Sequence, residues 1–70
     1  EISDGQIAWV RRRETLESGR VGIFVLGGMA YCKRLHVDAR GACLVSANPA
    51  YAPIPLTPEA DYRVCGEVVG

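Results

Sequence analysis

The chain has 70 residues, 49% of them hydrophobic, and its eight lysines and arginines are balanced by eight aspartates and glutamates. This length limits it to one small domain or part of one, and the apolar content excludes a disordered tail. Because the formal net charge is zero, no whole-domain field exists to hold a nucleic-acid backbone, and any DNA binding is expected to reside elsewhere.

The first expected strand is the short β-prone segment from Gln6 to Val10, opened by the turn pair Asp4-Gly5. The charged segment 11–17 follows and ends at Ser18-Gly19. It is too charged to be buried and too short to form a stable helix alone. We therefore expect a loop there, with at most one helical turn.

The strongest hairpin signal lies in the next part of the chain. An almost continuous apolar run from Val21 to Leu26 precedes the permissive pair Gly27-Gly28, after which Met29 to Leu35 is again β-prone. A second turn is predicted at residues 38–41, and it leads into a third strand of the same meander at residues 42–47.

The C-terminal third combines an interruption with a final strand. Asn48-Pro49 breaks the meander, and prolines at positions 53, 55 and 58 predict an extended, irregular stretch. Residues 62–69 are expected to form the last strand. No helical period occurs anywhere in the sequence. The predicted fold class is therefore all-β: a small, mostly antiparallel domain that forms a partial barrel from hairpins.

The second strand of the hairpin contains a lysine among apolar neighbours. Alternation places Tyr31, Lys33 and Leu35 on one face and Cys32 and Arg34 on the other. A lysine ammonium on a half-buried face loses hydration, which lowers its pKa and increases the neutral amine that can act as a base. The alternative is that Lys33 guards an exposed sheet edge against aggregation, and spacing alone does not decide between the two.

The cysteines and the histidine do not form a recognisable site. Cys32, Cys43 and Cys65 are odd in number and widely spaced, as in reduced cytosolic thiols. Cys32 is expected to be a small buried hydrophobe and not a reactive thiol. His36 is the only histidine and lacks further ligands nearby, so we expect a surface residue, no metal site and no cofactor.

Two other groups of side chains have simple structural interpretations. The run Arg11-Arg12-Arg13 could contact a phosphate, but Glu14 and Glu17 offset its charge, which favours a solvated loop. Trp9 and Tyr51 are expected to be core and turn-packing aromatics.

Several segments, taken in order, resemble the peptidase domain of LexA and phage repressors. They are the Asp4-Gly5 turn before a strand, the glycine before the next strand in Ser18-Gly19-Arg20-Val21, and the segment Tyr31-Cys32-Lys33-Arg34-Leu35. The segment 46–54 is also similar to the Asn-Pro-x-Tyr-x-Pro-Ile turn of phage-type members, and residues 65–70 are similar to their closing strand. The resemblance covers essentially the whole chain.

The resemblance implies a LexA/signal-peptidase-like β fold with a serine/lysine mechanism. A neutral lysine accepts the proton of a serine, which attacks a peptide bond of the repressor's own linker. Lys33 matches the lysine position and is the candidate catalytic residue. The family's serine belongs to a Gly-Asp/Asn-Ser-Met motif that precedes the Asp-Gly turn, before Glu1. Ser3 lies too close to the turn to match it, whereas Ser18 and Ser46 fall in turns, where hydroxyls usually cap backbone amides.

We therefore expect residues 1–70 to be the C-terminal part of a self-cleavage and dimerisation domain, inert alone because the serine, the linker and the DNA-binding domain are absent. The resemblance implies a homodimer, DNA contact only through the missing N-terminal domain, and an SOS-type response with a RecA-type activator of the intact protein. It also implies a cytoplasmic location without membrane contact, whereas signal peptidases, which share a related fold and dyad, need a membrane anchor. The final strand, residues 62–69, is expected to offer an unpaired edge to a partner.

Two alternatives stay open at this point. One is a repressor domain of the same fold that has lost catalysis and only dimerises. The other is an unrelated small β-barrel interaction domain, in which Lys33 is exposed and its match to the family is accidental.

Overall fold

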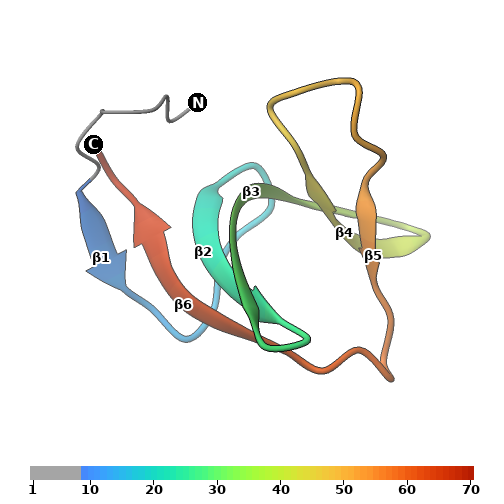
Figure 1. Ribbon diagram of the computed structural model, residues 1–70, viewed down its shortest axis with the longest axis horizontal. Coiled ribbons are helices and arrows are strands. Elements are labelled where there is room, and N and C mark those ends of the chain that lie inside the picture. Colours follow the sequence, from blue (N-terminus) through green and yellow to red (C-terminus); the bar gives the residue numbers. More distant parts are fainter. Residues whose placement is uncertain (1–8) are drawn as a thin grey trace.

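A computed structural model describes residues 9–70 of the chain, in which one antiparallel sheet contains all the regular structure (Figure 1). The strands are β1 (Val10–Arg12), β2 (Val21–Leu26), β3 (Met29–Asp38), β4 (Gly41–Val45), β5 (Ile54–Leu56) and β6 (Tyr62–Val68). Their order across the sheet is β1-β6-β2-β3-β4-β5. The predicted all-β, mostly antiparallel fold is confirmed. Within residues 9–70, no helix is long and apolar enough to span a membrane.

The hairpin between β2 and β3 turns at the predicted glycine pair. Leu26 is the register partner of Met29, and Gly27 and Gly28 connect them with φ angles of 57° and 82°. Positive φ at both central residues is the geometry of a type I′ turn, which glycine adopts without a steric cost. The turn thereby fixes the register of β3 and the face on which each of its side chains lies.

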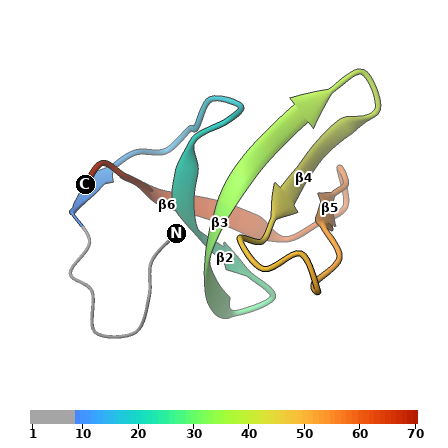
Figure 2. The same cartoon turned by 90° about the horizontal axis from the view of Figure 1, so that it is seen from above.

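A small core lies on the inner face of this curved sheet. Phe24 of β2, Leu35 of β3 and Leu44 of β4 are buried, and Leu35 and Leu44 are direct cross-strand partners. The partly buried residues that pack on them are Leu16, Ala42, Ile54, Leu56 and Val64. Figure 2 shows the curvature of the sheet from β2 through β3 to β4 and β5. Alternation along each strand places the intervening side chains on the outer face.

Two glycines allow the strands on either side of β6 to approach closely. A Cβ atom at Gly66 would lie 2.6 Å from Val10 Cγ1 and 2.8 Å from the Arg11 carbonyl oxygen. A Cβ atom at Gly22 would lie 2.7 Å from Leu16 Cδ2 and 2.9 Å from the Gly66 carbonyl oxygen. The absence of a side chain at both positions therefore permits β1, β6 and β2 to lie as one sheet.

Several predicted element boundaries are wrong. Arg11 and Arg12 belong to β1, paired with Glu67 and Gly66, instead of a loop. An edge strand of this kind needs backbone pairing but no burial, so charged side chains do not exclude it. The rest of the segment, residues 13–20, is a loop without a helical turn, in agreement with the prediction. Of the predicted first strand, residues 6–8 lie outside the described residues.

The meander also differs in detail. β3 continues to Asp38, β4 ends at Val45, and the stretch predicted to be irregular contains β5. Pro55 lies in the middle of β5, which is the last strand of the sheet order. Proline is tolerated at such an edge because no neighbouring strand requires its missing amide proton.

The prediction that the final strand offers an unpaired edge is wrong for residues 66–68, which pair with β1. β6 pairs with β2 on one side, and on the other side its residues 66–68 pair with β1. The outermost strands of the described sheet are β1 and β5. Hydrogen bonds from Trp9 N to Gly70 O (3.0 Å) and from Val69 N to Trp9 O (2.8 Å) continue this pairing beyond β1 and β6. The Trp9 side chain is 71% exposed, so its predicted place in the core is also wrong.

Candidate functional site

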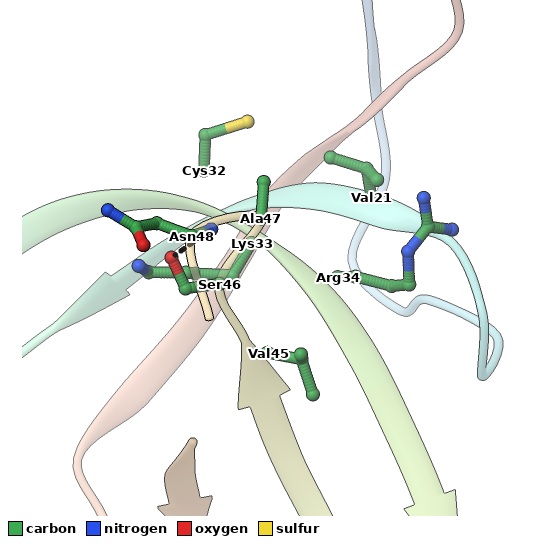
Figure 3. A pocket seen from close by; sticks show the side chains of 8 residues that line it. All are labelled: Val21, Cys32, Lys33, Arg34, Val45, Ser46, Ala47 and Asn48. Carbon is green, nitrogen blue, oxygen red and sulfur yellow. Dashed lines mark hydrogen bonds between the residues drawn. The ribbon is translucent and has the colours of Figure 1, made fainter. Parts of the chain in front are cut away.

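Lys33 lies near the middle of β3, where its register partner on β2 is Gly22. Its side chain is half-buried and borders a cavity of about 220 Å³ beside the end of β4 (Figure 3). The other residues that line this cavity are Val21, Cys32, Arg34, Val45, Ser46, Ala47 and Asn48. β4 ends at Val45, the register partner of Arg34, so β4 does not pair with β3 at Lys33, and the cavity lies at this end of the β3–β4 pairing.

The faces predicted for this strand are confirmed. Tyr31 and Lys33 are half-buried and Leu35 is buried, whereas Cys32 and Arg34 are exposed. β3 lies between β2 and β4 in the sheet order, but its pairing with β4 begins only at Arg34. Lys33 is thus paired with β2 alone in the described sheet, and the interpretation of Lys33 as an edge residue stays open. The prediction that Cys32 is buried is wrong, because it lies on the outer face, opposite to the core residue Leu35.

Two tyrosine rings flank the Lys33 amine. The Nζ atom lies 6.0 Å from the centre of the Tyr31 ring and 5.9 Å from the centre of the Tyr51 ring. Tyr31 shares the face of Lys33 by alternation, so its position follows from the strand period. Tyr51 comes from the loop after β4, and strand periodicity gives no signal for it. The only clue in the sequence is the Asn48-Pro49 turn that precedes it.

Short-range hydrogen bonds shape the loop that places Tyr51 near Lys33. The Asn48 amide donates to Ser46 Oγ (3.2 Å), and the Ala50 amide donates to Asn48 Oδ1 (2.9 Å). The Tyr51 amide then donates to the Asn48 carbonyl at 3.2 Å. Figure 3 shows the first of these bonds beside the Lys33 side chain. Tyr51 is thus a turn residue, as predicted, but it is 65% exposed.

The end of the β1–β2 loop is attached to β3. Ser18 Oγ accepts the Val37 amide at 2.9 Å, and the Gly19 amide donates to the Leu35 carbonyl at 2.8 Å. The Arg34 guanidinium also donates to the Gly19 carbonyl. Ser18 and Ser46 therefore both cap backbone amides, as the sequence predicts. Ser3 lies outside the described residues.

The arginine run contributes one ion pair on the far side of β2. Arg13 and Arg20 each have a nitrogen 3.7 Å from a carboxylate oxygen of Glu67, whose side chain is 13% exposed. Arg11 and Arg12 are exposed on β1. The two ends of the loop between β1 and β2 are thus held against β6 by one carboxylate.

His36 is a surface residue, as predicted. Its Nε2 atom lies 3.1 Å from Asp38 Oδ2, and the side chain is 53% exposed. The Arg40 amide donates to Asp38 and, together with the hydrogen bond from His36, lowers the pKa of Asp38 below its usual 3.8. In the part of the chain that the structure describes, no three histidine, cysteine or acidic side chains are grouped as metal ligands.

Comparison with known proteins places this geometry in a family context. A family model described as peptidase S24-like matches residues 1–69. A LexA repressor of Oleidesulfovibrio alaskensis is 41% identical over 69 residues, which are 99% of this chain and 33% of that protein. A LexA repressor of Syntrophotalea carbinolica is 38% identical over 99% of this chain and 34% of its own length. LexA repressor 2 of Pseudomonas syringae is 33% identical over 99% of this chain and 34% of its own length. The chain spans about a third of the length of these curated relatives.

Proposed function

The chain belongs to the S24-like peptidase family, and on this premise we propose that it is the lysine-bearing, C-terminal part of the self-cleavage and dimerisation domain of a LexA-like transcriptional repressor. The position of Lys33 is the observation that supports the proposal. It is the only lysine of the chain, it is half-buried beside an open cavity on β3, and its segment, Tyr31 to Leu35, resembles the one that carries the dyad lysine in the family. The names of the relatives agree with a repressor.

In the proposed reaction, Lys33 acts as a general base and then as a general acid. Its neutral amine takes the proton of a serine hydroxyl while the serine oxygen attacks a carbonyl carbon in the repressor's linker. The lysine ammonium next donates its proton to the departing amine nitrogen, which leaves an ester on the serine. Water hydrolyses that ester and restores the serine. No cofactor takes part in these steps.

Within this proposal the serine is contributed by the family's Gly-Asp/Asn-Ser-Met motif, which precedes the Asp4-Gly5 turn and is not among residues 1–70. Ser18 and Ser46 are unsuitable, because their hydroxyls hold the backbone amides of Val37 and Asn48. We therefore expect the 70-residue chain to be inert by itself.

The association of the chain with partners is also part of the proposal. We propose a homodimer, DNA contact through a separate N-terminal domain, a RecA-type activator and a cytoplasmic location. Because β1 pairs with residues 66–68 of β6, we no longer assign the dimer contact to the edge of that part of β6. The exposed apolar side chains Trp9, Val10 and Val69, at one end of the β1–β6 pair, are the better candidates, since large apolar residues are enriched at interfaces.

A test compares two alanine variants in the intact natural protein that contains this sequence. Lys33→Ala is expected to abolish the appearance of cleavage fragments in alkaline buffer. Arg40→Ala, at an exposed turn between β3 and β4, removes a distant cation and is expected to cut at the normal rate. Circular dichroism checks that both variants fold. Cleavage by Lys33→Ala at the rate of the unchanged protein would exclude Lys33 as the base.

A non-cleaving dimerisation module of the same family is the second candidate. It would share the β1–β6 contact but would yield no fragments from the unchanged protein at any pH. Membership of the S24-like family removes the alternative of an unrelated β-barrel.

A further inference from the structure

The Lys33 ammonium is approached by two tyrosine rings, and its cavity is also lined by the polar residues Ser46 and Asn48. Its Nζ atom has the Tyr31 ring at 6.0 Å and the Tyr51 ring at 5.9 Å. Within residues 9–70, the ion pairs are those of two arginines with Glu67 and of His36 with Asp38, so none involves Lys33. In this part of the chain, the Lys33 ammonium has two aromatic rings as neighbours and no carboxylate as an ion-pair partner.

The two rings affect the charged and neutral forms of the amine differently. The face of a tyrosine ring carries negative potential, so it attracts an ammonium within about 6 Å of its centre, a contact worth about 0.5–1 kcal/mol at exposed sites. A neutral amine has no charge and gains little from the same geometry. A pair of rings around a lysine therefore favours the form that cannot act as a base.

We propose that Tyr31 and Tyr51 are positioning residues that restrain the candidate base by holding Lys33 in its charged form. This inference rests on the proposed function of Lys33 and adds its regulation. Tyr31 is fixed by the ladder of β3, whereas Tyr51 lies in a loop and is 65% exposed. Tyr51 is thus the partner that can move away, and its removal or displacement makes the neutral amine easier to form.

Among residues 9–70, the charged groups on the elements next to Lys33 are paired with other residues or directed away from its amine. Gly22, opposite it on β2, has no side chain, and Glu67 on β6 is engaged with Arg13 and Arg20. Arg34, the next residue on β3, points away from the Lys33 amine in Figure 3. From the loop after β4, the titratable side chain that faces Lys33 is Tyr51 itself.

The test measures how fast an amine-reactive acylating reagent modifies Lys33 in the intact protein, with the modified peptide identified by mass spectrometry. Acylation requires the neutral amine, so its rate follows the neutral fraction. For Tyr51→Leu we expect about threefold faster acylation near neutral pH, equal to about 0.65 kcal/mol at 1.36 kcal/mol per tenfold change. The rates should converge in strongly alkaline buffer, where the amine is neutral in both proteins.

The matched variants separate charge from access. Tyr51→Phe keeps the ring and is expected to restore the unchanged profile, and Tyr62→Leu, which removes a ring from β6, should leave Lys33 acylation unaltered. If Tyr51→Leu raised the rate by one factor at every pH, the ring would only block access, and the proposal would be wrong. A rate that is unchanged or lower near neutral pH would also overturn it.

Self-cleavage of the intact protein supplies the functional consequence. Tyr51→Leu is expected to cut about threefold faster near neutral pH, with no gain at strongly alkaline pH. Slower cutting at all pH values would mean that Tyr51 only supports the site, and would refute the restraint. Self-cleavage of Lys33→Ala at the normal rate would instead refute the role of Lys33 as the base. The acylation experiment would still decide separately whether Tyr51 favours the charged form of Lys33.

Discussion

Replacing Gly66 with alanine tests whether close packing of β1 on β6 holds the sheet together. The new Cβ atom would lie 2.6 Å from Val10 Cγ1 and 2.8 Å from the Arg11 carbonyl oxygen. The valine side chain is 50% exposed and can rotate away, but the carbonyl belongs to the backbone and moves only if β1 does. Overpacking of this kind costs about 1–3 kcal/mol, partly offset by about 0.5–1 kcal/mol from the lower chain entropy of alanine in the unfolded state.

The net loss of unfolding free energy expected for Gly66→Ala is thus centred at about 1 kcal/mol. Urea unfolding measures this loss, and with a slope of about 1 kcal/mol per molar the midpoint should fall by about 1 M. Adding Val10→Ala should restore part of the loss, because it removes the 2.6 Å contact but leaves the carbonyl contact. An unchanged or higher midpoint in Gly66→Ala would show that β1 is not packed against β6 as described.

Three further changes probe the core, the dimer and the acid response. Phe24→Ala empties a fully buried position and should lower the free energy of unfolding by about 3–5 kcal/mol, whereas so small a domain has about 4–10 kcal/mol in total. Thermal unfolding of this variant should therefore begin at or near room temperature. A melting curve like that of the unchanged protein would contradict this prediction. Trp9→Ala should weaken the proposed homodimer. If sedimentation gave the same dimer dissociation constant for this variant and the unchanged protein, Trp9 would be excluded from the dimer contact. Because hydrogen bonds to Asp38 lower its folded-state pKa below 3.8, its contribution to stability is present above that pH and is lost as the pH falls through the folded value. In urea unfolding, Asp38→Asn should therefore lose stability relative to the unchanged protein near neutral pH but not in strong acid, and an equal loss at both would refute the assignment.

Features of the fold that depend on neighbouring residues were predictable from the sequence. The Gly27-Gly28 turn and the alternation from Tyr31 to Leu35 are local, since turn chemistry and strand period act over a few residues. They suffice to place Lys33 on the face of the core and Cys32 on the other face. They do not show that the outer face is exposed, so the burial expected for Cys32 was wrong.

Features that depend on distant parts of the chain were not predictable. The position of β6 between β1 and β2 joins segments from the two ends of the described chain, and no local pattern encodes that pairing. β5 was missed because Pro55 argues against a strand unless the strand is known to be at an edge. The approach of Tyr51 to Lys33 likewise depends on how the loop after β4 folds back.

The pH dependence of self-cleavage in the intact protein tests the role of Lys33 most directly. The rate should rise with pH as the amine loses one proton and then reach a plateau. Lys33→Ala and Lys33→Arg should both stay uncut over the whole range, because alanine has no base and the guanidinium of arginine is not deprotonated in proteins. A rate that does not change with pH, or a rising curve that persists in Lys33→Ala, would contradict the account.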